Sequence, residues 1–468
     1  MSSIAELSRA AGHPDARLMG SECEYNLQTV LGSPIKPYIG PEAVQAAGIN
    51  FNNNYLGMAG SAGKLYVDIN EHPEFASAES LGPASAGVED IHGIQILKDV
   101  VRASGLPHAG LYRTAGTYIA EGIRKNGVNT TSGHHKSFLV DRSLVQEQLL
   151  DDVLPGLLAT MLWAMGGTLR EEGYVFSQKI RACGEKPLAR ELVRRTNHGQ
   201  KPMVTIPRTQ EDNDVIGNEA QARVEVRCVD PTQSLTISYL SFAAISLALR
   251  MVQHKVVFSA DAFDWVSLKD PVRAAHAFAG DLSLTKSVET QRRGTISAVG
   301  VQDRFVALAH TLAMSDTCDL PADERAAIEL WAETVDVLRA SDPSKLDYPA
   351  KASLRLGFAR RHQFIANDIP LGNIDNTNVR AMSRNIVWDR VLPEGPASLF
   401  WAHINSHDPI AADIRAYHRL YGLAGRAVLR GQIIDAQSVV ASHVTNWSHI
   451  RVDGISYTLD DPYRLTLP

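Results

Sequence analysis

Residues 16–29 have the sequence ARLMGSECEYNLQT, in which apolar and polar residues alternate through the middle. This period of two predicts a half-buried β-strand. Side chains two positions apart on a strand point to the same face, so Glu22 and Glu24 form a pair of neighbouring carboxylates. Such a pair is costly without a counter-charge, and a divalent cation is the usual one. The stretch therefore indicates either a metal site or a solvated strand face at a sheet edge.

A second strand is predicted at residues 64–69, KLYVDI, from its β-branched and aromatic content. Asp68 is disfavoured inside so apolar a strand, and Tyr66 shares its face. Pro73 is expected to end the strand because it cannot donate to a ladder, which leaves Glu74 just beyond the strand end. The alternatives are a functional site built at the strand end and an acidic surface turn.

Two histidines follow a glycine in residues 131–136, TSGHHK. Neutral imidazole is a good ligand for several divalent metals, and glycine lets a ligand approach the backbone closely. Because a histidine is more often structural than a ligand, we expect only one of the pair to bind metal and assign that role to His135.

Residues 222–229, ARVEVRCV, alternate as a strand and place Arg223, Glu225 and Arg227 on one face. A carboxylate between two guanidiniums suits a metal ligand beside phosphate-binding arginines. The same pattern suits a cross-strand salt-bridge ladder on the solvent side, and the strand alone does not decide between them.

The composition limits the possible classes of protein. The chain has 468 residues, 46 Lys+Arg against 52 Asp+Glu, a formal net charge of −6 and 44% hydrophobic residues. This composition is globular and lacks the basic excess of a nucleic-acid or anionic-membrane binder. No apolar run approaches the ~18 residues of a membrane span, and residues 1–20 lack the pattern of a secretory signal. The cysteines have no paired spacing, which indicates reduced thiols in a cytoplasmic protein.

Strand patterns in runs, with helical patterns between them, predict an α+β fold with a largely antiparallel sheet. Apolar residues recur at helical spacing in residues 86–104, 143–168 with a break at Pro155, 236–256, 322–340 and 349–365. A Pro/Gly-rich hinge at residues 392–396 predicts two parts, a catalytic domain at 1–391 and a small C-terminal domain at 397–468.

The acids, the histidine and the arginines together are what an ATP-dependent carboxylate chemistry requires. Acids hold Mg²⁺ on the phosphates, arginines stabilise the charge of the transferred phosphoryl group, and a base deprotonates an amine. The sequence contains neither the GxxxxGK[ST] phosphate loop nor the GxGxxG turn, so the phosphates are held in another way.

The sequence resembles the glutamine synthetase superfamily, and within it the branch of Pup ligases and depupylases, where Pup is the prokaryotic ubiquitin-like protein. The resemblance is carried by GSECEY at residues 20–25, LYVD at 65–68, HPEFASAE at 72–79, GHHKSF at 133–138, SQK at 177–179, DY at 347–348 with Lys351, TNW at 445–447 and DPYR at 461–464. The block around residues 65–79 is highly specific. The resemblance implies a glutamine synthetase-like fold, in which a largely antiparallel curved sheet is backed by helices.

The resemblance also implies roles for the matching positions. Mg²⁺ would be bound by Glu22, Tyr66 and Glu74. ATP would be contacted by Lys64, Ser77 and Trp447. The catalytic base would be Asp68.

Three positions depart from the branch. Lys64 stands where the branch has Arg, Lys136 where it has Glu, and Glu225 where it has His. The Arg-Val-Glu-Val-Arg strand is instead similar to the metal-ligand strand of glutamine synthetases themselves. The departures leave open whether Pup is the partner.

We therefore expect an ATP- and Mg²⁺-dependent carboxylate–amine ligase. ATP phosphorylates the carboxylate of a small acid or a Pup-like protein, and an amine attacks the acyl phosphate to give an amide or isopeptide bond. One alternative is a depupylase-like amidase that keeps the nucleotide as a cofactor, and another is a nucleotide-binding scaffold without catalysis. The connection between Glu22 and Asp68 lacks the long loop typical of depupylases, which favours the ligase. The sequence gives no oligomeric state.

These patterns predict the arrangement of the site. We expect one pocket for two or more Mg²⁺ ions, formed by Glu22, Glu24, Glu74, His135 and Glu225. Arg223 and Arg227 are expected to stabilise the transferred phosphoryl group, and Asp68 to lie near the γ-phosphate without binding metal. Trp447 is expected to pack on the adenine or ribose, since an indole offers a flat face to a base; the alternative is a core position.

Overall fold

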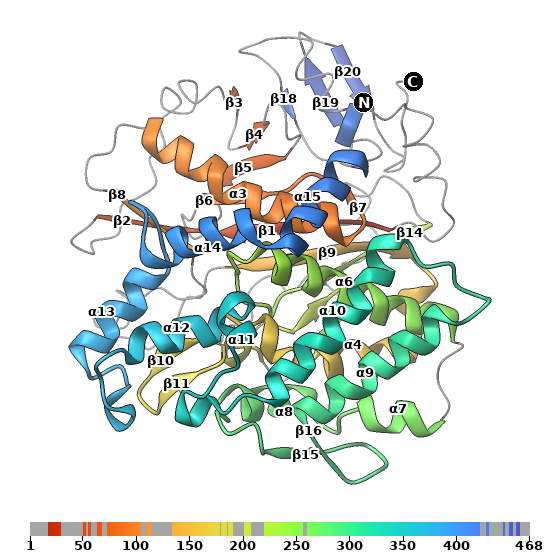
Figure 1. The fold of residues 1–468 in the computed structure, drawn as a ribbon. Helices are drawn as coiled ribbons and strands as arrows, with labels where there is room; N and C mark the ends of the chain where they lie inside the picture. Colours follow the sequence, from red (N-terminus) through yellow and green to blue (C-terminus); the bar gives the residue numbers. More distant parts are fainter. Residues whose placement is uncertain are drawn as a thin grey trace.

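The computed structural model shows an α+β fold in which a central sheet is backed by helices (Figure 1). The structure describes residues 17–29, 50–52, 55–57, 63–67, 73–103, 109–113, 133–177, 179–184, 186–190, 201–206, 220–255, 260–421, 427–429, 443–444, 449–452 and 455–458.

The central sheet has the strand order β12-β13-β14-β9-β1-β6-β5-β4-β3, and β7 also pairs with β1. All neighbouring strands are antiparallel except β12 and β13, which confirms the largely antiparallel sheet predicted from the sequence. The strands are β1 (Leu18–Glu24), β3 (Asn50–Asn52), β4 (Tyr55–Gly57), β5 (Lys64–Val67), β6 (Pro73–Ala76), β7 (Ser80–Leu81), β9 (His134–Asp141), β12 (Leu188–Ala189), β13 (Val204–Thr205) and β14 (Gln221–Val226).

Four smaller sheets and a set of helices complete the described part of the fold. The smaller sheets are formed by β2 (Asn26–Thr29), β8 (Ala109–Tyr112) and β17 (Arg390–Leu392); β10 (Thr168–Arg170) and β11 (Gly173–Val175); β15 (Ser287–Glu289) and β16 (Thr295–Ser297); and β18 (His443–Val444), β19 (His449–Val452) and β20 (Ile455–Thr458). The helices are α3 (Pro83–Ala103), α4 (Gln148–Thr160), α6 (Leu235–His254), α7 (Ala260–Val266), α8 (Pro271–Ala279), α9 (Ala298–Ala313), α10 (Ala322–Arg339), α11 (Ala350–Arg355), α12 (Gly357–Ala366), α13 (Val379–Trp388), α14 (Pro396–His407) and α15 (Pro409–Tyr421).

The apolar side chains of the sheet decide which face becomes core. Cys23, Leu65 and Phe75, on three adjacent strands, form a buried cluster with Leu97 of α3. Farther along the sheet, Phe138 belongs to the large core cluster that contains most of α6. Because side chains alternate along a strand, the polar residues between these positions point to the opposite face. That face is the one available for a polar site.

Helix α6 lies at the centre of the helical layer. It is long and apolar enough to cross a membrane, with a mean hydropathy of 1.6 over its most apolar 18 residues, but all of these 18 residues are buried inside the protein. It packs against α3, α4, α9 and α10. Ser234 caps its first turn by accepting a hydrogen bond from the Ile237 N–H, which begins the helix at a defined residue. This burial identifies α6 as a core helix.

Two local predictions were wrong, both at prolines. Pro73 begins β6 instead of ending the strand before it, and β5 is described only as far as Val67. Proline is tolerated as the first residue of a strand, and its carbonyl accepts from the Tyr25 N–H at 2.8 Å. Helix α4 continues through Pro155, and the Asp151 carbonyl that loses its helical bond belongs to a half-buried residue.

The predicted division between residues 1–391 and 397–468 stays a prediction. β17 pairs with β8, which comes much earlier in the chain. In α14, Asn405 accepts a hydrogen bond from the Leu235 N–H at 3.0 Å, and α15 packs against α3. The two helices that follow the predicted hinge are therefore attached to the body formed by the preceding residues.

A buried carboxylate connects α10 to the start of α3. Asp323 Oδ2 accepts from the Ala84 N–H at 3.2 Å. Gly82, with a φ of 85°, lies so close that a Cβ there would be 2.6 Å from the same oxygen. Burial, followed by the charge of Glu324, raises the pKa of Asp323 to about 7. Burial and Glu324 thus favour the protonated carboxyl, while the hydrogen bond from the Ala84 N–H acts in the opposite direction.

The contribution of Asp323 to the free energy of unfolding is expected to fall as pH rises from about 4 to about 7. The folded carboxyl keeps its proton across this range while the unfolded one loses it, so the folded state binds more protons. Asp323→Asn should remove this contribution and make urea unfolding less pH-dependent between about pH 4 and pH 7. An identical pH dependence in the variant and the unaltered protein would contradict the assignment.

Candidate active site

The strand register gathers the predicted polar residues on the sheet face opposite α3. On β1, Glu22 pairs with His135 of β9, and Glu24 pairs with Glu74 of β6. Glu74 in turn pairs with Tyr66 of β5. Directly opposite residues point to the same face, as do residues two apart on one strand. These five residues therefore lie on one side of the sheet.

Glu225 lies on this face too, because it pairs with Ser137, two residues beyond His135 on β9. Glu22 and Glu225 therefore lie on the same face of the sheet. Positions on opposite faces would have contradicted a shared pocket. His135 Nδ1 is 3.4 Å from Glu22 Oε2 and 3.5 Å from Glu225 Oε1. The imidazole thus lies between carboxylates of two different strands.

Glu22, Glu74 and His135 are arranged as a set of metal ligands. Each offers one ligand atom, and these atoms lie within 4.8 Å of one another. Burial, followed by the charge of Arg227, lowers the pKa of His135 well below its ordinary value, so the imidazole is neutral. Its Nε2 is buried and finds no hydrogen-bond partner in the described part of the chain. Two carboxylates and a neutral imidazole suit a divalent cation such as Mg²⁺ or Mn²⁺.

Glu24 lies beside this set but is held by backbone. Its Oε2 accepts from the Gly133 N–H at 2.5 Å, and its own N–H donates to the Gly133 carbonyl at 2.9 Å. A Cβ at Gly133 would lie 2.6 Å from Glu24 Oε1, so only glycine permits this approach. The Glu24 carboxylate therefore fixes the chain where it enters β9, and its metal role stays a prediction.

Two arginines border the carboxylates at β14. Arg227 Nη1 is 2.9 Å from Glu225 Oε1, and Arg223 Nη2 is 3.4 Å from Glu225 Oε2. Burial acts to raise the pKa of Glu225, but the guanidiniums of Arg223 and Arg227 hold it below its ordinary value. Glu225 is thus ionised and paired within its own strand. It is available as a metal ligand, and it also forms the salt bridges that the alternative interpretation of this strand requires.

Lys179 is a basic residue of the site to which the sequence analysis gave no role. Its amine is buried, and burial lowers its pKa while the charge of Glu24 opposes that effect. Its position depends on Asp230, whose carboxylate accepts from the Lys179 N–H at 3.2 Å and from Ser177 Oγ at 2.8 Å. The sequence signal for this residue was the Ser177-Gln178-Lys179 motif. The motif alone does not show that the Lys179 amine lies in the site, because that position depends on the folded structure.

The three residues predicted to contact the nucleotide differ in their positions. Lys64 is buried on β5 and pairs with Ala76, so it lies on the site face. The Ser77 hydroxyl accepts from the Ser21 N–H at 2.8 Å, so it is already bound to the backbone of β1. Trp447 lies outside the described residues, and its contact with a nucleotide stays a prediction.

The two remaining predicted residues lie on or next to β5. Burial, followed by the charges of Glu22 and Glu74, raises the pKa of Tyr66, so its phenol keeps its proton. A protonated phenol is a hydrogen-bond donor to the neighbouring carboxylates. Asp68, the predicted base, lies just beyond β5 and outside the described residues.

Comparisons with known proteins identify the family of this chain. A family model described as Pup-ligase protein matches residues 31–451. The Pup–protein ligase of Paenarthrobacter aurescens (strain TC1) is 22% identical over 468 residues, which span 96% of this chain and 97% of that protein. The Pup–protein ligase of Acidimicrobium ferrooxidans is 24% identical over 311 residues, 64% of each chain.

Solved structures give the same fold. The complex between Pup and its ligase PafA has a TM-score of 0.72 at 18% identity, and the match covers 97% of this chain and 90% of that chain. PafA in complex with ADP has a TM-score of 0.67 at 16% identity, with coverages of 89% and 88%. The α+β, glutamine synthetase-like fold expected from the sequence is confirmed.

The match to the family model extends over most of the chain, from residue 31 to residue 451, and includes the strands from β3 to β18 and most of β19. The relatives named above are ligases, so the depupylase-like amidase is not the favoured alternative. The chain belongs to the Pup-ligase protein family.

Proposed function

We propose that this chain is an ATP- and Mg²⁺-dependent ligase that joins a carboxylate to an amine through an isopeptide or amide bond. The observation that carries the proposal is the convergence of Glu22, Glu74 and His135, whose ligand atoms lie within 4.8 Å of one another. Arg223 and Arg227 border them on the next strand. Acids for a metal and cations for phosphate, side by side, are what phosphoryl transfer requires.

Glu22, Glu74 and His135 would hold the first Mg²⁺, and Glu24 and Glu225 would complete a second site. When bound, Mg²⁺ neutralises the charge that develops on the transferred phosphoryl group. The protein's own contribution is to bring these side chains together and to bury Glu74 and His135. His135 is neutral and Glu225 is ionised, as the directions of their pKa values indicate.

Arg223, Arg227 and Lys179 would bind and orient the phosphoryl end of the nucleotide. The Arg227 side chain is 13% exposed and pairs with Glu225, which is 4% exposed. A guanidinium presents parallel N–H groups to two phosphate oxygens, which fixes direction as well as charge. Lys64 and Ser77 would contact ATP from β5 and the end of β6, and Trp447 would pack on its base.

The reaction proceeds in two steps, phosphorylation of the carboxylate and attack by the amine. A carboxylate oxygen of the donor attacks the γ-phosphorus of ATP, the bond to ADP breaks, and an acyl phosphate forms. Asp68 takes a proton from the amine, whose nitrogen attacks the acyl carbon and expels phosphate. We propose a glutamate side chain of a Pup-like protein as donor and a protein amine as acceptor.

We further propose a cytoplasmic location for this reaction. Its support is that all four cysteines are free and buried, so the fold does not depend on an oxidising compartment.

The test of the function is stoichiometric. The purified protein is incubated with ATP, Mg²⁺, a Pup-like protein and candidate amines, and ADP and conjugates are counted. A ligase is expected to release one ADP for each bond formed. Amide cleavage that continues with a non-hydrolysable ATP analogue, without any ATP-linked conjugate, would overturn the proposal in favour of the amidase.

A further inference from the structure

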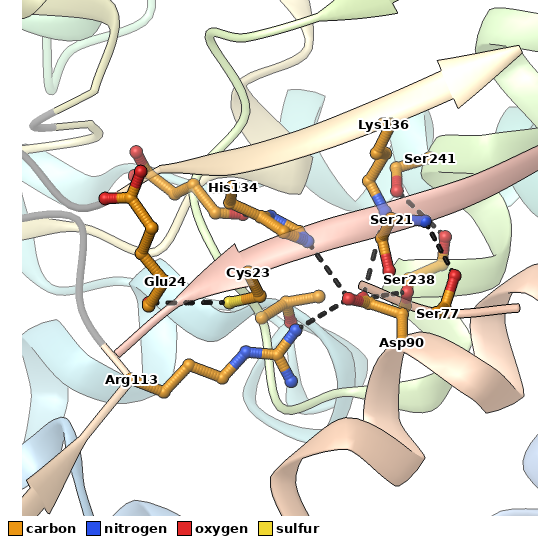
Figure 2. A network of polar contacts seen from close by, with 12 residues as sticks. Ser21, Cys23, Glu24, Ser77, Asp90, Arg113, His134, Lys136, Ser238 and Ser241 are labelled. Carbon is orange, nitrogen blue, oxygen red and sulfur yellow. Dashed lines mark hydrogen bonds and ion pairs between the residues drawn. The ribbon is translucent and has the colours of Figure 1, made fainter. Parts of the chain in front are cut away.

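A fully buried charged cluster lies behind the proposed metal ligands, on the α3 side of the sheet (Figure 2). Asp90 of α3 accepts from Arg113 Nη2 at 2.9 Å and from Ser238 Oγ at 2.6 Å. It lies 3.1 Å from His134 Nε2 and 3.9 Å from Lys136 Nζ. The side chains of Asp90, Arg113, His134 and Lys136 have no exposed surface. One carboxylate thus connects a helix to residues of β9, the end of β8 and α6.

This cluster is attached to the segments that present the metal ligands. His134 and Lys136 flank His135 on β9, and their cross-strand partners on β1 flank Glu22. Because side chains alternate, the flanking residues point backward while His135 and Glu22 point forward. Figure 2 shows the same alternation at the next position, where the Glu24 side chain points away from the cluster. Asp90 therefore contacts β9 directly behind the proposed site.

Two glycines allow so short a side chain to reach the sheet. Gly87 and Gly93 lie one helical turn before and after Asp90, on the same side of α3. A Cβ at Gly93 would lie 2.3 Å from Phe75 Cδ1, and one at Gly87 would lie 2.9 Å from the Tyr239 nitrogen. The backbone of α3 therefore approaches Phe75 of β6 at Gly93 and Tyr239 of α6 at Gly87, and Asp90 lies on the helix between the two glycines.

Asp90 is the carboxylate that this buried cluster depends on. Burial acts to raise its pKa, but Arg113, His134 and Lys136 hold the pKa well below its ordinary value, so it is ionised. The Lys136 ammonium lies 3.6 Å above the centre of the Phe242 ring and has no hydrogen-bond acceptor among the residues that the structure describes. Without Asp90, two cations would remain buried without their carboxylate, which is costly enough to displace β9.

We propose that Asp90 is a positioning residue for the metal site: by holding His134 and Lys136 from behind, it fixes His135 against Glu22. The inference rests on the proposed metal-binding function. Residues that orient metal ligands from outside the ligand set typically change metal affinity by ~10–100-fold when they are removed. The role of Asp90 can therefore be measured as a change in metal affinity, without measuring catalysis.

The test compares Asp90→Asn with a matched variant, Glu324→Gln. Glu324 is also buried, also accepts from a serine of α6, Ser246 Oγ at 2.8 Å, and also pairs with a buried arginine. Glu324 lies on α10 and contacts α6, away from the cluster around Asp90. Mn²⁺ affinity of the full chain, measured by electron paramagnetic resonance on protein shown to be folded, should fall ~10–100-fold in Asp90→Asn. In Glu324→Gln it should stay within ~2-fold, although both variants melt at lower temperature.

The outcomes separate this inference from the proposed function. Absence of Mn²⁺ binding by the unaltered protein would overturn the metal site, and the role of Asp90 with it. Unaltered Mn²⁺ affinity in folded Asp90→Asn, or an equal loss in Glu324→Gln, would overturn the role of Asp90 alone. If Asp90→Asn does not fold, Ser238→Ala removes one of its hydrogen bonds. Ser238→Ala should then weaken Mn²⁺ binding several-fold while Ser246→Ala does not, and equal affinities in these two would also overturn it.

Discussion

Replacing Asp68 with asparagine is expected to slow turnover by ~10²–10⁴-fold, the usual loss when a general base is removed. Asparagine keeps the shape of the side chain but cannot take the proton of the attacking amine. Nucleotide affinity is expected to stay within ~2-fold, because an interaction made only in the transition state does not alter ground-state binding. Steady-state rates at saturating ATP, together with equilibrium nucleotide binding, measure the two quantities separately.

A suitable control is Asp99→Asn, since Asp99 is a 55% exposed aspartate on α3 that contacts Arg102 on the same helix. It should leave both the rate and the nucleotide affinity unchanged. A near wild-type rate for Asp68→Asn would show that Asp68 has a structural role and that the proton of the amine goes elsewhere.

Glu74→Gln is expected to lower the rate by ~10²–10³-fold at a fixed Mg²⁺ concentration, the size of loss seen when one electrostatic stabiliser is removed from an active site. Glu74 supplies one of the three clustered ligand atoms, and an amide oxygen is a weaker ligand without a charge. The rate should recover in part as Mg²⁺ is raised, because the defect lies in metal affinity. A titration of rate against Mg²⁺ concentration measures this shift.

Glu329→Gln is the matched control for that titration, because its carboxylate is 79% exposed on α10. Both variants remove one negative charge, so a shift caused by net charge alone would appear in both. A Mg²⁺ dependence of Glu74→Gln that coincides with that of the unaltered protein would remove Glu74 from the ligand set.

The period-two patterns of the sequence predicted which residues share a face, and the structure confirms this for Glu22 with Glu24 and for Arg223 with Glu225. The choice between His134 and His135 followed a general expectation, and the register now gives its physical reason. His135 lies opposite Glu22, so it shares the front face, whereas His134 points back to Asp90. Alternation within a strand is a local property, so the sequence is sufficient to predict which residues of one strand share a face.

The order of the strands in the sheet, and the contacts between residues of different strands, could not be predicted from the sequence. Nothing local shows that β9 lies between β1 and β14, so the contact of Glu225 with His135 required the folded sheet. Asp90 was missed because an aspartate within a helical pattern looks like a residue of the solvent face. The spacing of Gly87 and Gly93 around it was the available signal, but the close approach it permits is a property of the neighbouring elements.

The buried helix α6 has a consequence for the newly made chain. Before it folds, this segment has the length and mean hydropathy of a membrane-spanning helix, although its apolar residues are interrupted by serines and by Arg250. Its principal partner, α3, precedes it in the sequence, so a docking surface has already left the ribosome when α6 emerges. We therefore expect a circularly permuted chain that begins with α6 to expose this helix before α3 has been made.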